Sequence, residues 1–227
     1  MKLTIAESFY VLIHHPEKPR VMVTEAVRNA GMIGAIFLDL SVEGNVVIED
    51  GLIRVKSIKS KLPPIHREIL NKMADSVKLR KPKSWISRLT QTAGKTKRSL
   101  VEELERKGLM EVEHKRLLFI SYIRTWLSRT DAREKIIKEL RGIVFDKKGF
   151  DGHYAGLLGL VQACKMHKLI STDRQEVKDS KARIKKIIES DLITQGVGTV
   201  IQEMQAAMMA AIIASTAATT AATAASH

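Results

Sequence analysis

Residues 100–120 read LVEELERKGLMEVEHKRLLFI, and this stretch is the most distinctive in the chain. Its first part continues a helix predicted over residues 96–107, which Gly108 ends because glycine readily adopts the left-handed conformation of a C-cap. The residues that follow predict a strand, a polar turn at residues 114–116 and a returning strand that contains an unbroken apolar run. A helix followed by a hairpin is therefore expected here.

A second hairpin is predicted by NVVIEDGLIRV at residues 45–55. Asp50-Gly51 joins two β-branched runs, and this dipeptide favours the two-residue turn of a hairpin. Helical spacing of apolar residues dominates elsewhere, and Thr4 with Glu7 forms a capping box at the first helix. Helices are predicted at residues 4–13, 22–42, 65–75, from 85, 130–145, 153–167, 174–190 and from 194. The fold class is mainly α.

The composition indicates a globular protein. The chain has 227 residues, of which 44% are apolar and 28% charged, and these values exclude a disordered chain, a collagen and a polytopic membrane protein. Cys164 is the single cysteine, so no intramolecular disulfide can form. Glu7 interrupts the apolar stretch near the N-terminus, which does not match a signal peptide. We expect a cytoplasmic protein.

The C-terminal segment carries no charged residue from Met204 to Ser226. It is long enough to span a membrane, but most of its residues are Ala, Thr, Ser and Gln, whose insertion gains little free energy. We interpret it as a central core helix up to about Ser215, followed by a low-complexity tail. The predicted organisation is a single domain over residues 1–215 and a tail over residues 216–227.

Positive charge is concentrated in one segment. The net charge is +13, and residues 54–98 alone contribute +12, with fourteen Lys or Arg opposed only by Glu68 and Asp75. Such a field attracts an anionic partner, which can be a phosphorylated lipid headgroup, a membrane surface or nucleic acid. A solvated face that keeps the protein soluble is the alternative.

Motifs for catalysis are absent from the sequence. Residues 93–96, AGKT, imitate the end of a phosphate-binding loop, but Leu89 stands where its first glycine should be. Cys164 and His167 have no further ligands at a spacing that completes a zinc site, so we expect no metal. No serine or carboxylate pair has a catalytic context. We predict no catalytic residues, no cofactor and no enzyme activity.

The order of these segments resembles the Golgi phosphoprotein 3 family. The resemblance is carried by LTIAESFYVLI (3–13), GMIGAIFLDLSVEGNVVIEDGLIRV (31–55), KSWISRLTQ (83–91) and LVEELERKGLMEVEHKRLLFI (100–120). It extends from Leu3 to about Ala214 and implies a central apolar helical bundle ringed by amphipathic helices, with two short β-hairpins. Because the chain starts directly at this domain, it looks like a compact, bacterial-type member.

The resemblance also implies a peripheral membrane protein that binds phosphatidylinositol 4-phosphate through a basic pocket beside a membrane-inserting hairpin. By position, the hairpin is residues 109–120, with Leu117, Leu118 and Phe119 as the inserting residues. The same three residues can instead cover the domain's own core. Membrane-protein tails are a further partner that such an adaptor can bind.

The pocket of the family is only partly kept. Its tryptophan and one arginine correspond to Thr24 and Ile33, and two further arginines correspond to Gly94 and Lys97, so Lys97 alone keeps a cation. Nearby basic residues can replace the missing donors. The predicted headgroup site is Lys97, Arg98, Lys95, Lys81, Lys83 and Arg80. An anionic bacterial phospholipid is an alternative ligand.

A nucleic-acid-binding protein is the alternative from another class. The helix and hairpin of residues 99–120 also resemble the last helix and wing of a winged helix, and a strongly basic domain suits phosphate-backbone binding. Glu102, Glu103 and Glu105 argue against it, because these acids lie on the helix that would enter the major groove. The sequence does not predict an oligomeric state.

Overall fold

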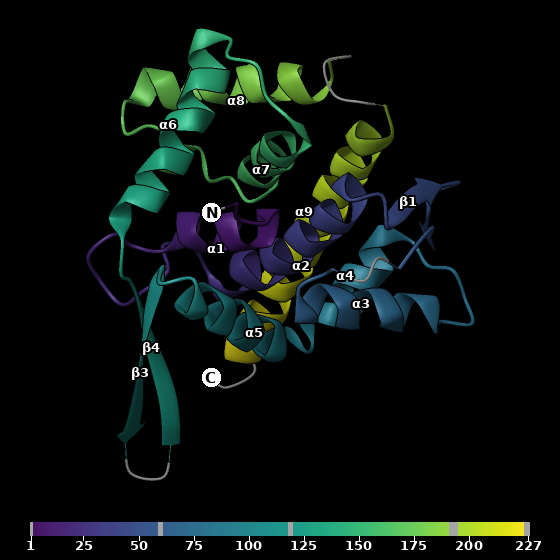
Figure 1. Cartoon of the computed structure of the whole chain (residues 1–227), viewed down its shortest axis with the longest axis horizontal. Helices are drawn as coiled ribbons and strands as arrows, with labels where there is room; N and C mark the ends of the chain where they lie inside the picture. Colours follow the sequence, from purple (N-terminus) through teal and green to yellow (C-terminus); the bar gives the residue numbers. More distant parts are fainter. Residues whose placement is uncertain (1, 59–60, 118–119, 191–194, 225–227) are drawn as a thin grey trace.

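The centre of the fold consists of helices that are apolar on nearly every face. In the computed structural model, which describes residues 2–58, 61–117, 120–190 and 195–224, α2 packs against α1, α7 and α9 (Figure 1). All of α1 is buried, as is α2 from Ala30 to Ser41, because a helix without a polar face must be covered on all sides. These helices are α1 (Ile5–Ile13), α2 (Glu25–Val42), α7 (Gly152–Ala163) and α9 (Gln195–Ala224).

Two glycines allow α9 to approach its neighbours closely. A Cβ at Gly34 of α2 would lie 2.2 Å from Sδ of Met208, and a Cβ at Gly159 of α7 would lie 2.7 Å from Cγ2 of Ile201. Both distances are shorter than van der Waals contact. The missing side chains therefore decide how deeply α9 is seated in the bundle.

Amphipathic helices surround this centre on two sides (Figure 1). Each turns an apolar stripe inward; α5, for example, buries Ala93, Leu100 and Leu104. One group is α3 (Pro64–Ala74), α4 (Pro82–Thr90) and α5 (Ala93–Arg106), and the other is α6 (Thr130–Asp146) and α8 (Arg174–Ile188), with a short 3₁₀ helix at His167–Leu169. The structure confirms the predicted mainly α bundle with its surrounding helices.

The first hairpin has the predicted turn. Strands β1 (Val46–Glu49) and β2 (Leu52–Val55) pair antiparallel, with Glu49 opposite Leu52. Asp50 and Gly51 have φ angles of 55° and 69°, which are the positive values that a type I′ turn requires. The prediction from Asp50-Gly51 is confirmed.

The second hairpin is longer than predicted, and its turn is elsewhere. Strands β3 (Met110–Leu117) and β4 (Ile120–Leu127) pair along their whole length, with His114 opposite Ile123 and Arg116 opposite Ser121. The turn predicted at residues 114–116 is therefore wrong. A two-stranded ribbon exposed to solvent accommodates polar side chains in its strands, so their polarity did not mark a turn. Residues 118–119 between the strands lie outside the described residues.

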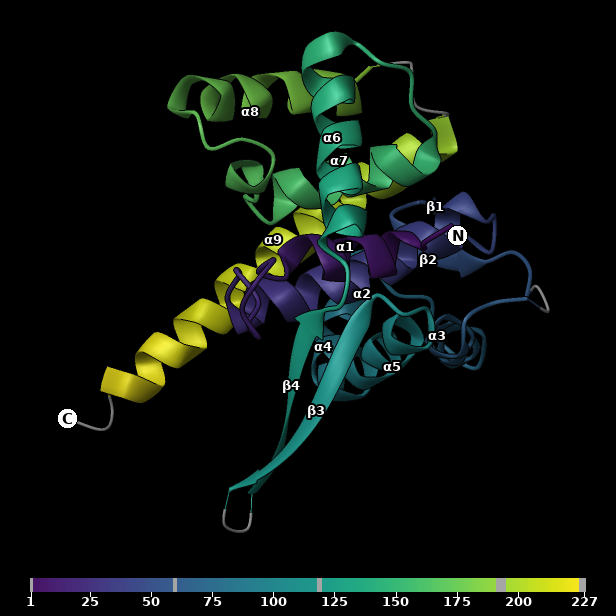
Figure 2. The same cartoon turned by 60° about the vertical axis from the view of Figure 1, so that its left-hand side comes forward.

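The hairpin extends away from the body of the protein, and so does the end of α9 (Figure 2). Helix α9 continues past Ser215, where the sequence suggested an end, to Ala224. Among the described residues, Gly198–Ala218 is the one stretch whose length and hydropathy would allow it to cross a membrane. Its first part is packed in the bundle, where Val200, Ile201 and Met204 are buried, whereas residues 213–218 are exposed.

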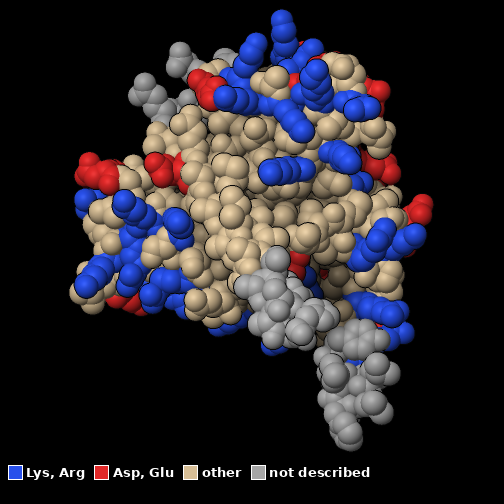
Figure 3. Space-filling view, turned by 180° about the vertical axis from the view of Figure 1, so that it is seen from behind, with Lys and Arg blue, Asp and Glu red and all other residues tan. Residues whose placement is uncertain are grey.

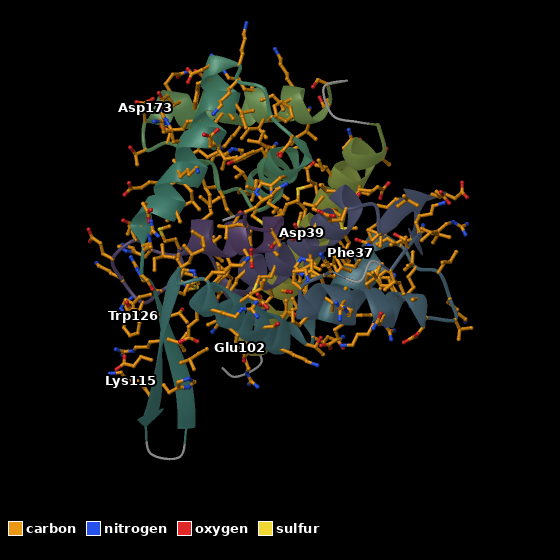
Figure 4. All side chains as sticks on the ribbon, viewed as in Figure 1. Phe37, Asp39, Glu102, Lys115, Trp126 and Asp173 are labelled. Atoms are coloured by element: carbon orange, nitrogen blue, oxygen red, sulfur yellow. The ribbon has the colours of Figure 1, made fainter. Side chains whose placement is uncertain are left out.

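A buried carboxylate joins the first two helices. Asp39 of α2 accepts hydrogen bonds from the backbone N–H groups of Ile5 (2.6 Å) and Ala6 (3.0 Å) at the start of α1, and from Nε2 of His66 (2.9 Å). Figure 4 shows Asp39 in the middle of the molecule. The predicted capping box is also present, because the Thr4 hydroxyl accepts from Glu7 N and the Glu7 carboxylate accepts from Thr4 N. Both interactions stabilise the first turn of α1.

Candidate functional site

The basic segment forms one side of the molecule. Its residues lie on β2, α3, α4, α5 and the loops between them, and in Figure 3, seen from behind, Lys and Arg side chains gather on the side where β1, α3 and α4 are located. We call this surface, formed by residues 54–98, the basic face. The basic residues of this segment therefore lie on one side of the molecule, although Figure 3 shows further Lys and Arg side chains at the top.

Arg80 is held in place by its backbone. Its carbonyl accepts a hydrogen bond from Ile53 N at 3.0 Å, which joins the loop before α4 to strand β2. The side chain lines a cavity together with Lys72 of α3 and with Trp85 and Arg88 of α4. Of the six predicted headgroup residues, Arg80 alone lines this cavity. Lys72, Trp85 and Arg88 were missed as site residues, because only the fold of the chain brings the end of α3 close to α4.

Lys95 and Lys97 lie two residues apart on α5 and face different helices. Nζ of Lys95 pairs with Oε2 of Glu68 on α3 at 2.8 Å, and hydrogen bonds from Lys95 and then Lys72 hold the pKa of Glu68 below its ordinary value. The cation of Lys95 is thus partly neutralised by a carboxylate on the neighbouring helix. Arg98, Lys81 and Lys83 are exposed, the last two at the start of α4.

Lys97 is half-buried beside the start of α2. Burial and then the nearby charge of Arg28 lower the pKa of Lys97, while Glu25 acts in the opposite direction. NH2 of Arg28 in turn donates to Oε1 of Glu25 at 2.8 Å. Arg28 was missed by the sequence analysis, although its place one helical turn after Thr24 was a signal that could have found it.

The other family pocket positions cannot supply a charged contact. Thr24 caps α2, because its hydroxyl oxygen accepts from Val27 N, and Ile33 is fully buried. Gly94 lies on the exposed first turn of α5, with no other group within 4 Å of where its Cβ would be. Of the four family positions, Lys97 alone therefore places a cation here, with Arg28 beside it.

The hairpin is firmly attached at its base. Leu109, Met110, Thr125 and Leu127 are buried there, and the Thr125 hydroxyl donates to Nε2 of His14 at 3.1 Å. Nδ1 of His14 donates to the carbonyl of Tyr10, and burial lowers the pKa of His14 to about 4, so its ring is neutral at pH 7. The base of the ribbon is therefore hydrogen-bonded to His14, the C-cap of α1.

Of the predicted inserting residues, the structure describes Leu117 alone. Leu117 is the last residue of β3 and pairs with Ile120. Leu118 and Phe119 lie outside the described residues, so their predicted role remains a prediction. Closer to the base, Lys115 pairs with Glu113 at 2.9 Å on the outward part of β3 (Figure 4).

Within the part of the chain that the structure describes, no group of three or more His, Cys, Asp or Glu residues could hold a metal ion. Cys164 is buried, and this burial raises the pKa of its thiol to about 12, so the thiol is protonated at pH 7 and is a poor nucleophile.

The model of the family described as Golgi phosphoprotein 3 (GPP34) matches residues 5–204, which include helices α1 to α8, the first part of α9, both hairpins and the basic face. No curated protein matches the chain.

Proposed function

Because the chain belongs to the Golgi phosphoprotein 3 family, we propose that it is a peripheral membrane protein that binds anionic phospholipid headgroups. The family is known for binding phosphatidylinositol 4-phosphate at Golgi membranes and is generally non-catalytic. Phosphatidylinositol 4-phosphate is accordingly the expected ligand. The basic face and the β3–β4 hairpin are proposed to contact the bilayer.

The concentration of charge on the basic face is the observation that carries this proposal. Residues 54–98 contribute +12 to a chain of net charge +13. Each basic side chain near an anionic membrane contributes about 1 kcal/mol, so a few of them hold the protein at the surface without a deep pocket. Lys81, Lys83 and Arg98 are exposed and free to do so.

The hairpin is proposed to add an apolar contact. Leu117, Leu118 and Phe119 are apolar in sequence, and Leu117 is the last residue of β3 in a ribbon that extends from the body (Figure 2). Apolar side chains that enter the interfacial region of a bilayer supplement the electrostatic attraction. Electrostatic attraction would then speed association with the membrane, and the hairpin would slow dissociation from it.

Co-sedimentation with vesicles tests the proposal. Three vesicle types are compared: neutral, generally anionic, and containing phosphatidylinositol 4-phosphate at the same total charge. We expect pelleting with the anionic vesicles, most strongly with the last. Neutralising Lys81, Lys83 and Arg98 with Gln should weaken binding about a hundredfold, since about 1 kcal/mol is lost at each position. Phe119→Asp should weaken binding further.

The control removes the same charge elsewhere. Lys178, Lys181 and Lys186 are exposed on α8, at the opposite end of the molecule from α3 and α4, and their replacement by Gln should change binding little. Equal losses in both triple variants would refute the basic face as the binding surface. Failure to pellet with any vesicle, together with salt-dependent binding to duplex DNA, would favour the nucleic-acid alternative instead.

A further inference from the structure

The cavity between α3 and α4 has the features of an anion site. It has a volume of about 430 Å³, which is within the range of small-molecule sites. Lys72 comes from the last turn of α3, Arg80 from the following loop and Arg88 from the last turn of α4. Trp85 and Leu89 supply an apolar wall. Three cations from three separate segments therefore surround one hollow.

The positive charge of this cavity is poorly compensated. No Asp or Glu is among its lining residues. Nζ of Lys72 forms a salt bridge with Oε1 of Glu68 at 2.9 Å. Glu68 does not line the cavity, however, and it also forms a salt bridge with Lys95. Among the described residues, no ion pair is found for Arg80 or Arg88, and Nε of Arg80 is buried without a hydrogen-bond partner. The described ion pairs therefore leave both guanidinium groups uncompensated, and their charge favours an anionic ligand.

The hydroxyl groups around the cavity have their protons committed to the backbone. Ser76 Oγ donates to the carbonyl of Lys78 at 2.9 Å, and Thr92 Oγ1 donates to the carbonyl of Leu89 at 3.1 Å. Their protons are already used, so the donors that remain in the lining are the two arginines, the lysine and the amide of Gln91. A ligand with several acceptor oxygens and more than one negative charge fits such a set, and a phosphate monoester has both.

We propose that this cavity binds a phosphate monoester, held by Lys72, Arg80 and Arg88. The inference rests on the proposed function in one respect, since at a membrane the monoester would belong to a lipid headgroup. The site is distinct from the positions that the family resemblance assigns, because Thr24, Ile33, Gly94 and Lys97 do not line it. It would give this chain headgroup selectivity although three of those four positions carry no cation.

The two tryptophans of the chain make the site directly observable. Trp85 lines the cavity, and Trp126 lies on β4, so the Trp126→Phe variant leaves Trp85 as the only reporter. This variant is titrated with soluble glycerophosphoinositol 4-phosphate, with glycerophosphoinositol, which lacks the monoester, and with inorganic phosphate. We expect a saturable change in Trp85 emission with the first probe and none with the second.

Substitutions assign the response to the cavity. Arg88→Gln removes an exposed cation and should weaken binding of glycerophosphoinositol 4-phosphate about tenfold, as for a lost charge-assisted hydrogen bond. Arg80→Gln should do the same, and its thermal unfolding shows whether it remains folded. Lys178→Gln is the matched control, because this exposed lysine of α8 lies outside the basic face and does not line the cavity.

The outcomes separate this inference from the proposed function. A Trp85 response that Arg88→Gln weakens supports the cavity even if no vesicle binds, in which case the membrane role alone fails. Vesicle binding without any Trp85 response, or a response that Arg88→Gln leaves unchanged, overturns the cavity and leaves the membrane role intact. Inorganic phosphate that binds as tightly as glycerophosphoinositol 4-phosphate overturns the lipid headgroup as the source of the monoester.

Discussion

Replacing Asp39 with Ala should destabilise the protein strongly. The carboxylate is 9% exposed and accepts three hydrogen bonds, from the N–H groups of Ile5 and Ala6 and from His66 Nε2. Removal leaves three buried donors without partners and deprives the N-terminus of α1 of its negative charge. Hydrogen bonds to a charged group contribute about 1.5–3 kcal/mol each, and water that enters the vacated space recovers part of this. We expect a loss of about 3–5 kcal/mol in the free energy of unfolding.

Urea unfolding followed by circular dichroism measures this loss. A change of this size is a large part of the total stability of a typical domain, so the midpoint should fall clearly while the slope stays the same. Asp39→Asn keeps one acceptor oxygen but directs an NH₂ group at a donor, so its loss should be intermediate. The free energy of unfolding should therefore fall in the order wild type, Asp39→Asn, Asp39→Ala.

Glu102→Ala is the matched control. Glu102 is an exposed carboxylate on α5, and Figure 4 shows it at the edge of the molecule, whereas Asp39 lies inside. Its loss should change stability by less than about 0.5 kcal/mol. If Asp39→Ala lost less than about 1 kcal/mol, the carboxylate would not hold α1 against α2 in the way described, and the reasoning would be refuted.

Two further predictions concern packing and pH. Gly159→Ala should destabilise the protein by about 1–2 kcal/mol, because the new Cβ would clash with the β-branched side chain of Ile201. Gly94→Ala, where the Cβ meets no other group, should stabilise the protein by up to about 1 kcal/mol. Thermal unfolding measures both changes, and the opposite ranking would contradict this packing. Stability should also fall as the pH drops from 6.5 towards 4. In this pH window His14 is protonated in the unfolded chain but not in the folded protein, where its pKa is about 4. The free energy of unfolding therefore falls by about 1.4 kcal/mol per pH unit. Burial also lowers the pKa of His167 to about 4, so His14→Gln should reduce only part of the dependence of stability on pH. Urea unfolding at pH 7, 6 and 5 measures this dependence. If His14→Gln leaves it unchanged, His14 does not contribute to it.

Features determined by neighbouring residues were predictable from the sequence. The capping box of Thr4 and Glu7, the turn at Asp50-Gly51 and the buried helix α2 all depend on signals within a few residues. The turn of the second hairpin was not predictable in the same way. The polar residues 114–116 have the composition of a turn, but pairing with β4, which depends on residues up to Leu127, places them inside a strand.

The composition of the candidate site was less predictable, because it depends on how helices pack. Residues two positions apart on a helix point in very different directions, so Lys95 faces Glu68 and Lys97 lies near Arg28. The sequence predicted a basic surface but not which cations share a neighbour. The same holds for Asp39, whose partners Ile5 and His66 are 34 and 27 residues away.

The burial of Ile33 bears on how a family member can change its ligand site. At 0% exposure this side chain belongs to the core, so the position cannot be restored to a headgroup contact without disturbing α2. Arg28, the remaining cation beside Lys97 at this end of α2, is already paired with Glu25. The cavity of Lys72, Arg80 and Arg88, by contrast, lies on surrounding helices and loops, where charge can be gained without cost to the core.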